Sequence, residues 1–213
     1  MDRLTPKLIG CGLRLDTALP LEERWKTLSQ QPAVAWFTGL SGAGKSTIAN
    51  VVDRCLVRNG RHTMVIDGDN LRKGLSSDLG FSDIDRTENI RRAAEAARLM
   101  AEAGLIVIVA MISPLRKDRA MARTILEGFL FMEIFIDTPL EICEARDTKG
   151  LYKLARAGDI KDFTGISSAY EAPNQPNIIA HTQNRTIEES AAQIIDALMC
   201  ATTPRLRDAN FDT

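Results

Sequence analysis

The hydrophobic and polar positions along the chain fall into two alternating kinds of segment. Short continuous apolar runs are typical of buried strands, and we place them at 33–38, 63–66, 105–112, 131–136 and 177–180. Segments with apolar residues three and four positions apart predict helices, which we place at 45–57, 87–103, 116–127, from 140 onward and at 186–199. This alternation predicts an α/β fold, with a parallel β-sheet of about five strands flanked by helices on both faces.

The length of 213 residues suits a single large domain. Residues 1–31 show no clean periodicity, and we interpret them as an N-terminal extension with one short helix near 21–28. Residues 32–200 form the predicted domain, and residues 201–213, with few apolar side chains, form a frayed C-terminal tail. Residues 147–176 are polar, basic and rich in glycine and proline, which predicts an irregular stretch, either a functional lid or disorder.

The overall charge and the cysteines argue against nucleic acid, membranes and zinc as binding partners. A net charge of -1 gives no basic field for nucleic acid or an acidic membrane, so we expect neither as a partner. The four cysteines are scattered, and neither they nor the two histidines have the spacing of a zinc site. No apolar run is long enough to span a bilayer and no signal peptide is visible, so we expect a cytoplasmic protein.

One glycine-rich segment follows the first predicted strand and opens the first helix. It matches the pattern G-x-x-x-x-G-K-[ST], in which glycines let backbone N–H groups approach phosphate oxygens at a helix N-terminus. Lys45 is predicted to neutralise charge on the β- and γ-phosphates of ATP, and the Ser46 hydroxyl to bind Mg²⁺. The predicted nucleotide-binding residues are Gly39, Leu40, Ser41, Gly42, Ala43, Gly44, Lys45, Ser46 and Thr47.

Two carboxylates follow the second predicted strand. Asp67 and Asp69 bracket Gly68 at the end of the sheet where such folds bind ligands. Carboxylates there can hold magnesium-bound water and accept the proton of an attacking hydroxyl, although Asp-Gly is also a strong turn signal. The short chain, and a third strand that does not end in an acidic residue, favour a small-molecule kinase over large P-loop ATPases.

A stretch dense in arginine comes next along the chain. Arg86 and Asn89 lie about one turn apart on the predicted helix, so their side chains can face one cleft. Guanidinium groups bind phosphate or sulfate oxygens through paired hydrogen bonds. For Arg91 a solvated charged face is the simpler interpretation, whereas for Arg86 and Asn89 we favour anion binding. Arg72 and Arg92 belong to the same stretch.

Further strings of residues between 67 and 173 complete the pattern. They are D-G-D-N-L-R at 67–72, L-G-F at 79–81, D-R-T-E-N-I-R-R at 85–92, I-S-P at 112–114, R-D-T-K-G-L-Y at 146–152, F-T-G-I at 163–166 and Y-E-A-P at 170–173. Together they resemble the adenylyl-sulfate kinases, over about residues 32–199 and without large gaps. Thr148 and Ala169 stand where the family usually has proline, which puts the rigidity of the lid in question.

The resemblance implies transfer of the γ-phosphate of MgATP to the 3′-hydroxyl of adenylyl sulfate, giving 3′-phosphoadenylyl sulfate and ADP. Phe81 and Phe163 would stack on the adenine of the acceptor, although core packing is the ordinary role of a phenylalanine. Asp69 would be the catalytic base, and 147–165 a lid that closes over ATP and excludes water. The other implied substrate-binding residues are Asp67, which also joins Ser46 at the metal, with Arg72, Arg86, Asn89, Ile112, Ser113, Lys149, Thr164 and, for added charge, Arg156.

Ser113 has a further implied role. The resemblance suggests a catalytic phosphoserine intermediate at this position. No base stands near Ser113 in the sequence, and direct in-line transfer needs only positioning and charge neutralisation. A Ser-Pro turn that lines the cleft is therefore the simpler interpretation.

Two alternatives use the same residues differently. A sibling kinase for another nucleotide-like hydroxyl would share the phosphate machinery and differ around Phe81, Arg86 and Asn89. A non-catalytic module that binds the sulfated nucleotide could dispense with Lys45 and the acidic pair, which this chain keeps. Residues 1–31 suggest a dimer arm or a linker, so a homodimer and a functional or fused sulfate adenylyltransferase are the expected protein partners.

Overall fold

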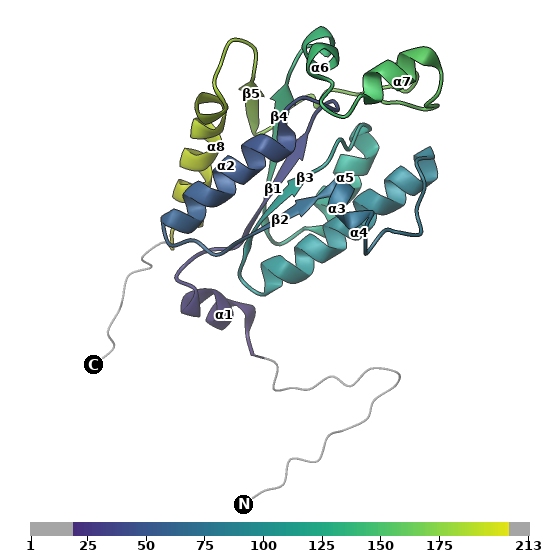
Figure 1. The fold of residues 1–213 in the computed structure, drawn as a ribbon. Coiled ribbons are helices and arrows are strands. Elements are labelled where there is room, and N and C mark those ends of the chain that lie inside the picture. Colours follow the sequence, from purple (N-terminus) through teal and green to yellow (C-terminus); the bar gives the residue numbers. More distant parts are fainter. Residues whose placement is uncertain (1–18, 205–213) are drawn as a thin grey trace, which may run out of the picture.

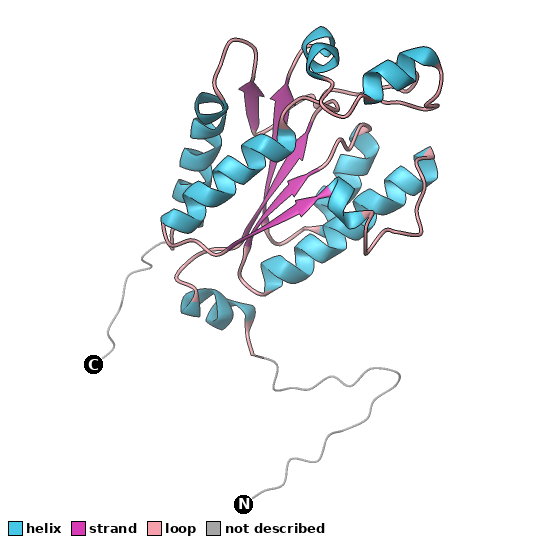
Figure 2. Cartoon of the chain, in the orientation of Figure 1, coloured by secondary structure: helices cyan, strands magenta, loops and turns pink. Residues whose placement is uncertain are grey.

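The computed structural model describes residues 19–204, so the predictions for 1–18 and 205–213 lie outside the described residues. Figures 1 and 2 show a sheet with helices on both faces, which confirms the predicted fold class. The strand order is β2-β3-β1-β4-β5, and each neighbouring pair is parallel. The strands are β1 (Ala33–Thr38), β2 (Thr63–Asp67), β3 (Ile106–Ala110), β4 (Leu130–Asp137) and β5 (Ile178–His181).

The helices pack in two layers around this sheet. Helices α2 and α8 cover one face, and α4 and α5 cover the other (Figure 1). None of the described helices is long and apolar enough to cross a membrane. The helices are α1 (Leu21–Thr27), α2 (Lys45–Arg58), α3 (Gly68–Leu71), α4 (Asp83–Glu102), α5 (Arg116–Ile125), α6 (Leu140–Arg146), α7 (Leu151–Ala157) and α8 (Ile187–Thr202).

The central strand β1 explains why its sequence is a continuous apolar run. All of its residues are buried, because both faces of the sheet are covered. Ala33, Ala35 and Phe37 contribute to the core on the α2 and α8 side, while Val34 and Trp36 contribute to the core on the α4 and α5 side. The phosphate loop and the loop after β3 thus start from buried strands, which fixes the backbone from which the site is built.

One helix is present where the sequence predicts irregular structure. The stretch 147–176 contains α7, whose first turn is capped by the Asp147 carboxylate. This carboxylate accepts hydrogen bonds from the N–H groups of Tyr152 and Lys153, both at 3.0 Å. Gly150 precedes the helix with a φ of 67°, a conformation that glycine adopts without strain. The prediction was wrong because basic residues and flanking glycines obscure the short apolar pattern.

Two further helices, α4 and α3, differ from the prediction. Helix α4 begins at Asp83 rather than at 87, because the Ser82 hydroxyl caps it by accepting a 3.2 Å hydrogen bond from the Asp85 N–H. The short helix α3, which the sequence pattern did not predict, follows β2 directly. Its N-cap is Asp67, so one of the predicted site residues also has a structural role.

Residues 21–31 fold onto the amino-terminal end of the sheet, opposite α6 and α7 (Figure 1). Helix α1 confirms the short helix predicted near 21–28. The Trp25 indole donates a 3.3 Å hydrogen bond to the C-terminal turn of α4. The Gln30 amide donates to the carbonyl oxygens of His62 at 2.9 Å and Gly104 at 2.7 Å, and it accepts from the His62 N–H. This part of the N-terminal segment therefore closes the base of the domain.

Candidate functional site

The phosphate loop connects β1 to α2 at the carboxyl end of the sheet. Two of its glycines are required by close packing as well as by backbone angle. A Cβ on Gly39, at a φ of 150°, would lie 2.7 Å from the Ile136 carbonyl oxygen. A Cβ on Gly42, at a φ of 72°, would lie 3.0 Å from the Cys143 carbonyl oxygen. Side chains at either position would displace the loop from the strand and helix behind it.

The Lys45 ammonium lies within the curve of this loop. Its side chain is 8% exposed, and Nζ donates hydrogen bonds to the carbonyl oxygens of Gly39 at 2.9 Å and Leu40 at 2.7 Å. Burial lowers the pKa of Lys45 to about 8, against the attraction of Asp69 and Asp67 among its neighbours. The charge therefore stands where phosphate oxygens would meet it, held by carbonyl groups that a nucleotide would replace.

Ser46 and Asp67, the two predicted metal ligands, lie together. The Ser46 hydroxyl donates a 2.6 Å hydrogen bond to Asp67 Oδ2. The other oxygen, Oδ1, accepts from the Asp69 N–H at 2.9 Å, which fixes the carboxylate at the start of α3. Two oxygen donors held side by side at the phosphate loop fit the preference of Mg²⁺ for oxygen ligands. No group of three or more metal-binding side chains occurs among residues 19–204.

Asp69, the predicted base, is paired with the lid. Its carboxylate forms an ion pair with Lys149, which precedes α7, and both side chains are exposed. The hydrogen bond to Asp69 raises the pKa of Lys149. The structure thus brings together two residues that are 80 positions apart in the sequence. The ion pair therefore links the lid to the Asp69 carboxylate beside the phosphate loop.

Arg86 joins the start of α4 to the far end of the lid. Its Nε donates to the Phe81 carbonyl oxygen at 2.8 Å, and one terminal nitrogen donates to Thr164 Oγ1 at 2.5 Å. The second terminal nitrogen contacts the carbonyl oxygen of Asp162. One turn along α4, Asn89 is buried, and its Oδ1 has no hydrogen-bond partner among the described residues. Three residues predicted to bind the acceptor, Arg86, Asn89 and Thr164, therefore lie at the first turns of α4.

The two predicted stacking phenylalanines have different environments. Phe81 is 65% exposed, and the Arg72 guanidinium lies 4.5 Å from the centre of its ring. Phe163 is 8% exposed and belongs to a core cluster, where its ring meets that of Tyr152 edge to face at 4.9 Å between centroids. Arg86 bonds the backbone of Phe81 and that of Asp162, beside Phe163. Stacking of both rings on one base stays a prediction.

Ser113 lies in a tightly held turn after β3. It is 2% exposed, with a φ of 38° that is uncommon for a non-glycine residue. The Trp36 indole donates to its Oγ at 3.1 Å, and Arg119 donates to its carbonyl oxygen at 2.7 Å. The preceding carbonyl oxygen, of Ile112, accepts from Thr38 at 2.7 Å. These contacts fit the turn interpretation of Ser113.

The remaining basic residues of the sequence pattern form surface ion pairs. Arg91 and Arg92 both bind Glu88, at 2.7 Å and 2.9 Å, on the outer side of α4. Arg156 binds Glu144, at 2.5 Å between its Nη2 and the carboxylate. Pairs of this kind contribute little to stability. For Arg91 the solvated face is therefore the environment that the structure shows.

Arg146, at the end of α6, and Tyr152, in the lid, contact the phosphate loop and were not predicted as site residues. Arg146 donates to the carbonyl oxygens of Gly42 and Ala43 at 3.4 Å and 3.3 Å. The Tyr152 hydroxyl donates to the Ser41 carbonyl oxygen at 2.9 Å. Both side chains act on backbone oxygens of the loop. The signal for them in the sequence was their place in the R-D-T-K-G-L-Y string, which alone does not identify a contact.

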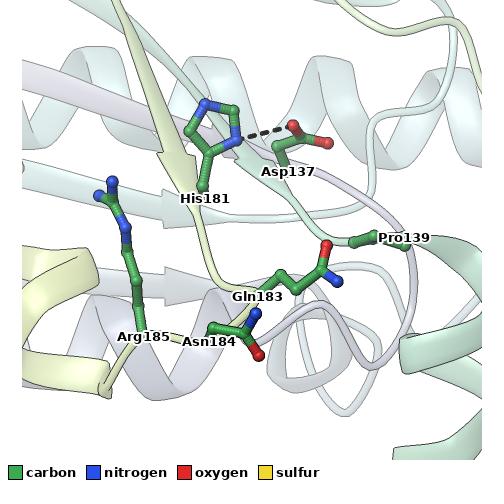
Figure 3. Close-up of a pocket in the computed structure, with 6 residues that line it drawn as sticks. All are labelled: Asp137, Pro139, His181, Gln183, Asn184 and Arg185. Atoms are coloured by element: carbon green, nitrogen blue, oxygen red, sulfur yellow. Dashed lines mark hydrogen bonds and ion pairs between the residues drawn. The ribbon is translucent and has the colours of Figure 1, made fainter.

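A polar cavity of about 440 Å³ lies at the carboxyl ends of β4 and β5 (Figure 3). On one side of it, His181 Nδ1 and Asp137 Oδ2 are 2.9 Å apart. Thr138 connects this cavity to the loop by a 3.0 Å hydrogen bond to the Ala43 carbonyl oxygen. The residues that line the cavity are Asp137, Pro139, His181, Gln183, Asn184 and Arg185.

The five-stranded parallel sheet and the glycine loop that cradles Lys45 define a P-loop protein of the kinase type. The family model for adenylylsulphate kinase matches residues 31–181. An adenylyl-sulfate kinase of Vibrio cholerae is 57% identical over 173 residues, which cover 81% of this chain and 80% of the relative. The chain belongs to the adenylyl-sulfate kinase family.

A solved structure and a longer relative extend the comparison. The APS kinase of Mycobacterium tuberculosis, solved in complex with AMPPNP and APS, is 50% identical with a TM-score of 0.77, and the match covers 79% of this chain and 98% of that one. The bifunctional enzyme NodQ of Rhizobium sp. (strain N33) is 50% identical over 210 residues, or 93% of this chain. The chain spans about a third of the length of NodQ, 32% in this case.

Proposed function

We propose that the protein transfers the γ-phosphate of MgATP to the 3′-hydroxyl of adenylyl sulfate, with 3′-phosphoadenylyl sulfate and ADP as products. The observation that carries the proposal is that the lid joins both halves of the site. Lys149 pairs with Asp69 beside the phosphate loop, and Thr164 binds Arg86 on the acceptor side. Membership of the adenylyl-sulfate kinase family supplies the identity of the acceptor.

On the donor side, the phosphates of ATP would bind the N–H groups of residues 39–47. Lys45 would exchange the Gly39 and Leu40 carbonyl oxygens for phosphate oxygens, a stronger charge-assisted contact. Mg²⁺ would be held by Ser46 and Asp67, and when bound it would neutralise charge on the transferred group. The cavity beside Thr138 lies at the correct end of the sheet to receive the nucleotide base.

On the acceptor side, Asp69 would accept the proton of the attacking hydroxyl once Lys149 moves from it toward the phosphates. Arg72 and Arg86 provide guanidinium groups for the phosphosulfate. Asn89 presents a buried oxygen that has no hydrogen-bond partner within residues 19–204, and a ribose hydroxyl would be a suitable donor to it. These assignments rest on the position of each group.

Direct in-line transfer, without a phosphoserine, fits the surroundings of Ser113. Its hydroxyl is buried and accepts the Trp36 N–H, and within the described part of the chain no hydrogen bond joins this side chain to a carboxylate or histidine. A nucleophilic serine needs such a base and access to the phosphate. The role we propose for Ser113 is to shape the loop after β3.

Several wider aspects of the proposal rest on the sequence and its relatives. A cytoplasmic location is proposed from the sequence. A homodimer is proposed from the sequence. A partnership with sulfate adenylyltransferase, functional or fused, is consistent with the match to part of the longer NodQ relatives.

The test is to incubate the protein with MgATP and a panel of nucleotides that carry a free 3′-hydroxyl, adenylyl sulfate among them. ADP release is followed by a coupled assay, and the product is identified by chromatography. Among the nucleotides of the panel, we expect only adenylyl sulfate to give rapid ADP release from MgATP. The variant Lys45→Ala should release no ADP with any of them. Rapid release with a different acceptor, and none with adenylyl sulfate, would favour a sibling kinase. Binding of adenylyl sulfate without any ADP release would favour the non-catalytic module.

A further inference from the structure

Tyr152 is a buried residue of the lid helix α7 that contacts both halves of the site. Its hydroxyl donates a 2.9 Å hydrogen bond to the Ser41 carbonyl oxygen in the phosphate loop. Its ring meets the Phe163 ring at an interplanar angle of 77°. Burial raises the pKa of Tyr152 well above its usual range, so the hydroxyl keeps its proton and remains a donor. The side chain is 2% exposed, so both contacts are shielded from water.

The contacts continue from Phe163 to the acceptor arginine. Thr164, the next residue along the chain, accepts the 2.5 Å hydrogen bond from Arg86. The Phe163 N–H donates to Ser167 at 2.8 Å, which holds this turn of the lid in place. An unbroken series of contacts therefore runs from Ser41 through Tyr152 and Phe163 to Arg86.

We propose that Tyr152 is a positioning residue that couples the two substrate sites, by carrying the conformation of the phosphate loop to the wall of the acceptor site. The inference rests on the proposed function, because it takes ATP and adenylyl sulfate as the two ligands. The Ser41 carbonyl belongs to the peptide unit that presents the Gly42 N–H, so a phosphate bound by that N–H would reorient the carbonyl. Tyr152 would follow it through the hydrogen bond from its hydroxyl, and its ring contact would carry the change to Phe163.

Such a coupling is a thermodynamic quantity that can be measured without catalysis. The dissociation constant of adenylyl sulfate is determined by calorimetry with and without the non-hydrolysable nucleotide AMPPNP and Mg²⁺, and the ratio of the two is the coupling factor. The reciprocal experiment, with AMPPNP as the titrant, must give the same factor. In Tyr152→Phe the ring contact with Phe163 remains, while the hydrogen bond from the hydroxyl to Ser41 is lost together with its contact with the Cys143 thiol. We expect the coupling factor of Tyr152→Phe to be closer to one than that of the wild type, by a factor of about two to ten. A change of this size corresponds to the free energy of a single hydrogen bond.

Tyr170→Phe provides a matched control. The Tyr170 hydroxyl bonds Thr38 at 3.0 Å and its ring stacks on Phe135, so this variant also loses one hydrogen bond from a tyrosine. Tyr170 does not belong to the series from Ser41 to Arg86, and we expect it to keep the wild-type coupling factor. A second variant, Phe163→Leu, breaks the same series at the ring contact. The double variant with Tyr152→Phe should lose no more coupling than the larger single loss, because the contacts act in series.

The outcomes separate this inference from the proposed function. A wild-type coupling factor of one, an unchanged factor in Tyr152→Phe, or an equal loss in Tyr170→Phe would each overturn the role of Tyr152. A wild-type protein that neither binds nor phosphorylates adenylyl sulfate would overturn the proposed function. Turnover of adenylyl sulfate by the wild type, together with an intact factor in Tyr152→Phe, would leave the proposed function standing and remove only the coupling residue.

Discussion

Burying the charged Lys45 side chain in the phosphate loop lowers the free energy of unfolding by an amount that depends on pH. Comparison with the variant Lys45→Met measures this amount. Burial lowers the pKa of Lys45 from 10.5 to about 8, while the unfolded chain has the ordinary value. Below pH 8 both states carry the charge, so the folded state bears the full penalty. As the pH rises from about 8 to 10.5, the folded state loses its proton first, and the penalty disappears.

The size of this effect follows from the shift. The pKa of Lys45 falls from 10.5 in the unfolded state to about 8 in the folded state. At about 1.4 kcal/mol per pKa unit, the free energy of unfolding should rise by about 3 kcal/mol from below pH 8 to above pH 10.5. Methionine fills a similar volume without a charge. Its loss of the bonds to Gly39 and Leu40 lowers stability by an amount that we expect to be nearly constant with pH. The difference in unfolding free energy between wild type and Lys45→Met therefore isolates the titration of the lysine.

The assay is urea denaturation of the nucleotide-free wild type and of Lys45→Met, at intervals from pH 7 to 10. We expect the wild type to gain stability relative to the variant as the pH rises above 8. Groups that titrate in both proteins cancel in the comparison. A difference that stays flat with pH, or that falls as the pH rises, would contradict the burial of a charged lysine against carbonyl oxygens.

The other predictions concern chemistry, mechanism and stability. Asp69→Asn should lower kcat by more than about two decades, the contribution of a general base, with the wild-type fold retained by circular dichroism. Ser113→Ala should keep substantial activity in the ADP-release assay, and complete loss in a folded variant would restore the phosphoserine route. Gln30→Ala should lower the unfolding free energy by about 2–4 kcal/mol in urea, because Gly104 and His62 lose buried hydrogen-bond partners; an unchanged midpoint would contradict a structural role for residues 21–31.

The two central strands were predictable because both faces of the sheet are covered there. Every residue of β1 and β3 is buried, and both strands are apolar apart from Thr38 at the end of β1, whereas the edge strands β2 and β5 have exposed positions. The place of the site followed as well, because parallel strands direct their carboxyl ends to one edge and the residues rich in chemistry follow those ends. The hydrogen bond between Ser46 and Asp67 is a direct result of that geometry.

The lid was harder to predict because its order depends on tertiary contacts. Helix α7 is too short to be stable by its own propensity, and it depends on the Asp147 cap and on Tyr152 packing beneath it. The sequence alone did not distinguish Phe81 from Phe163, since each has a glycine within two residues. Only the fold shows that one ring is exposed under Arg72 and the other is buried.

The charged groups of the site all have partners before any substrate binds. Lys45 binds carbonyl oxygens of its own loop, Asp69 binds Lys149, and Arg86 binds the lid. Substrate binding is then an exchange of partners, so its free energy is the difference between two sets of polar contacts. If ATP and adenylyl sulfate are the substrates, we expect each of them to release lid contacts, because the lid supplies partners on both sides of the site. Binding of the first substrate would then favour binding of the second.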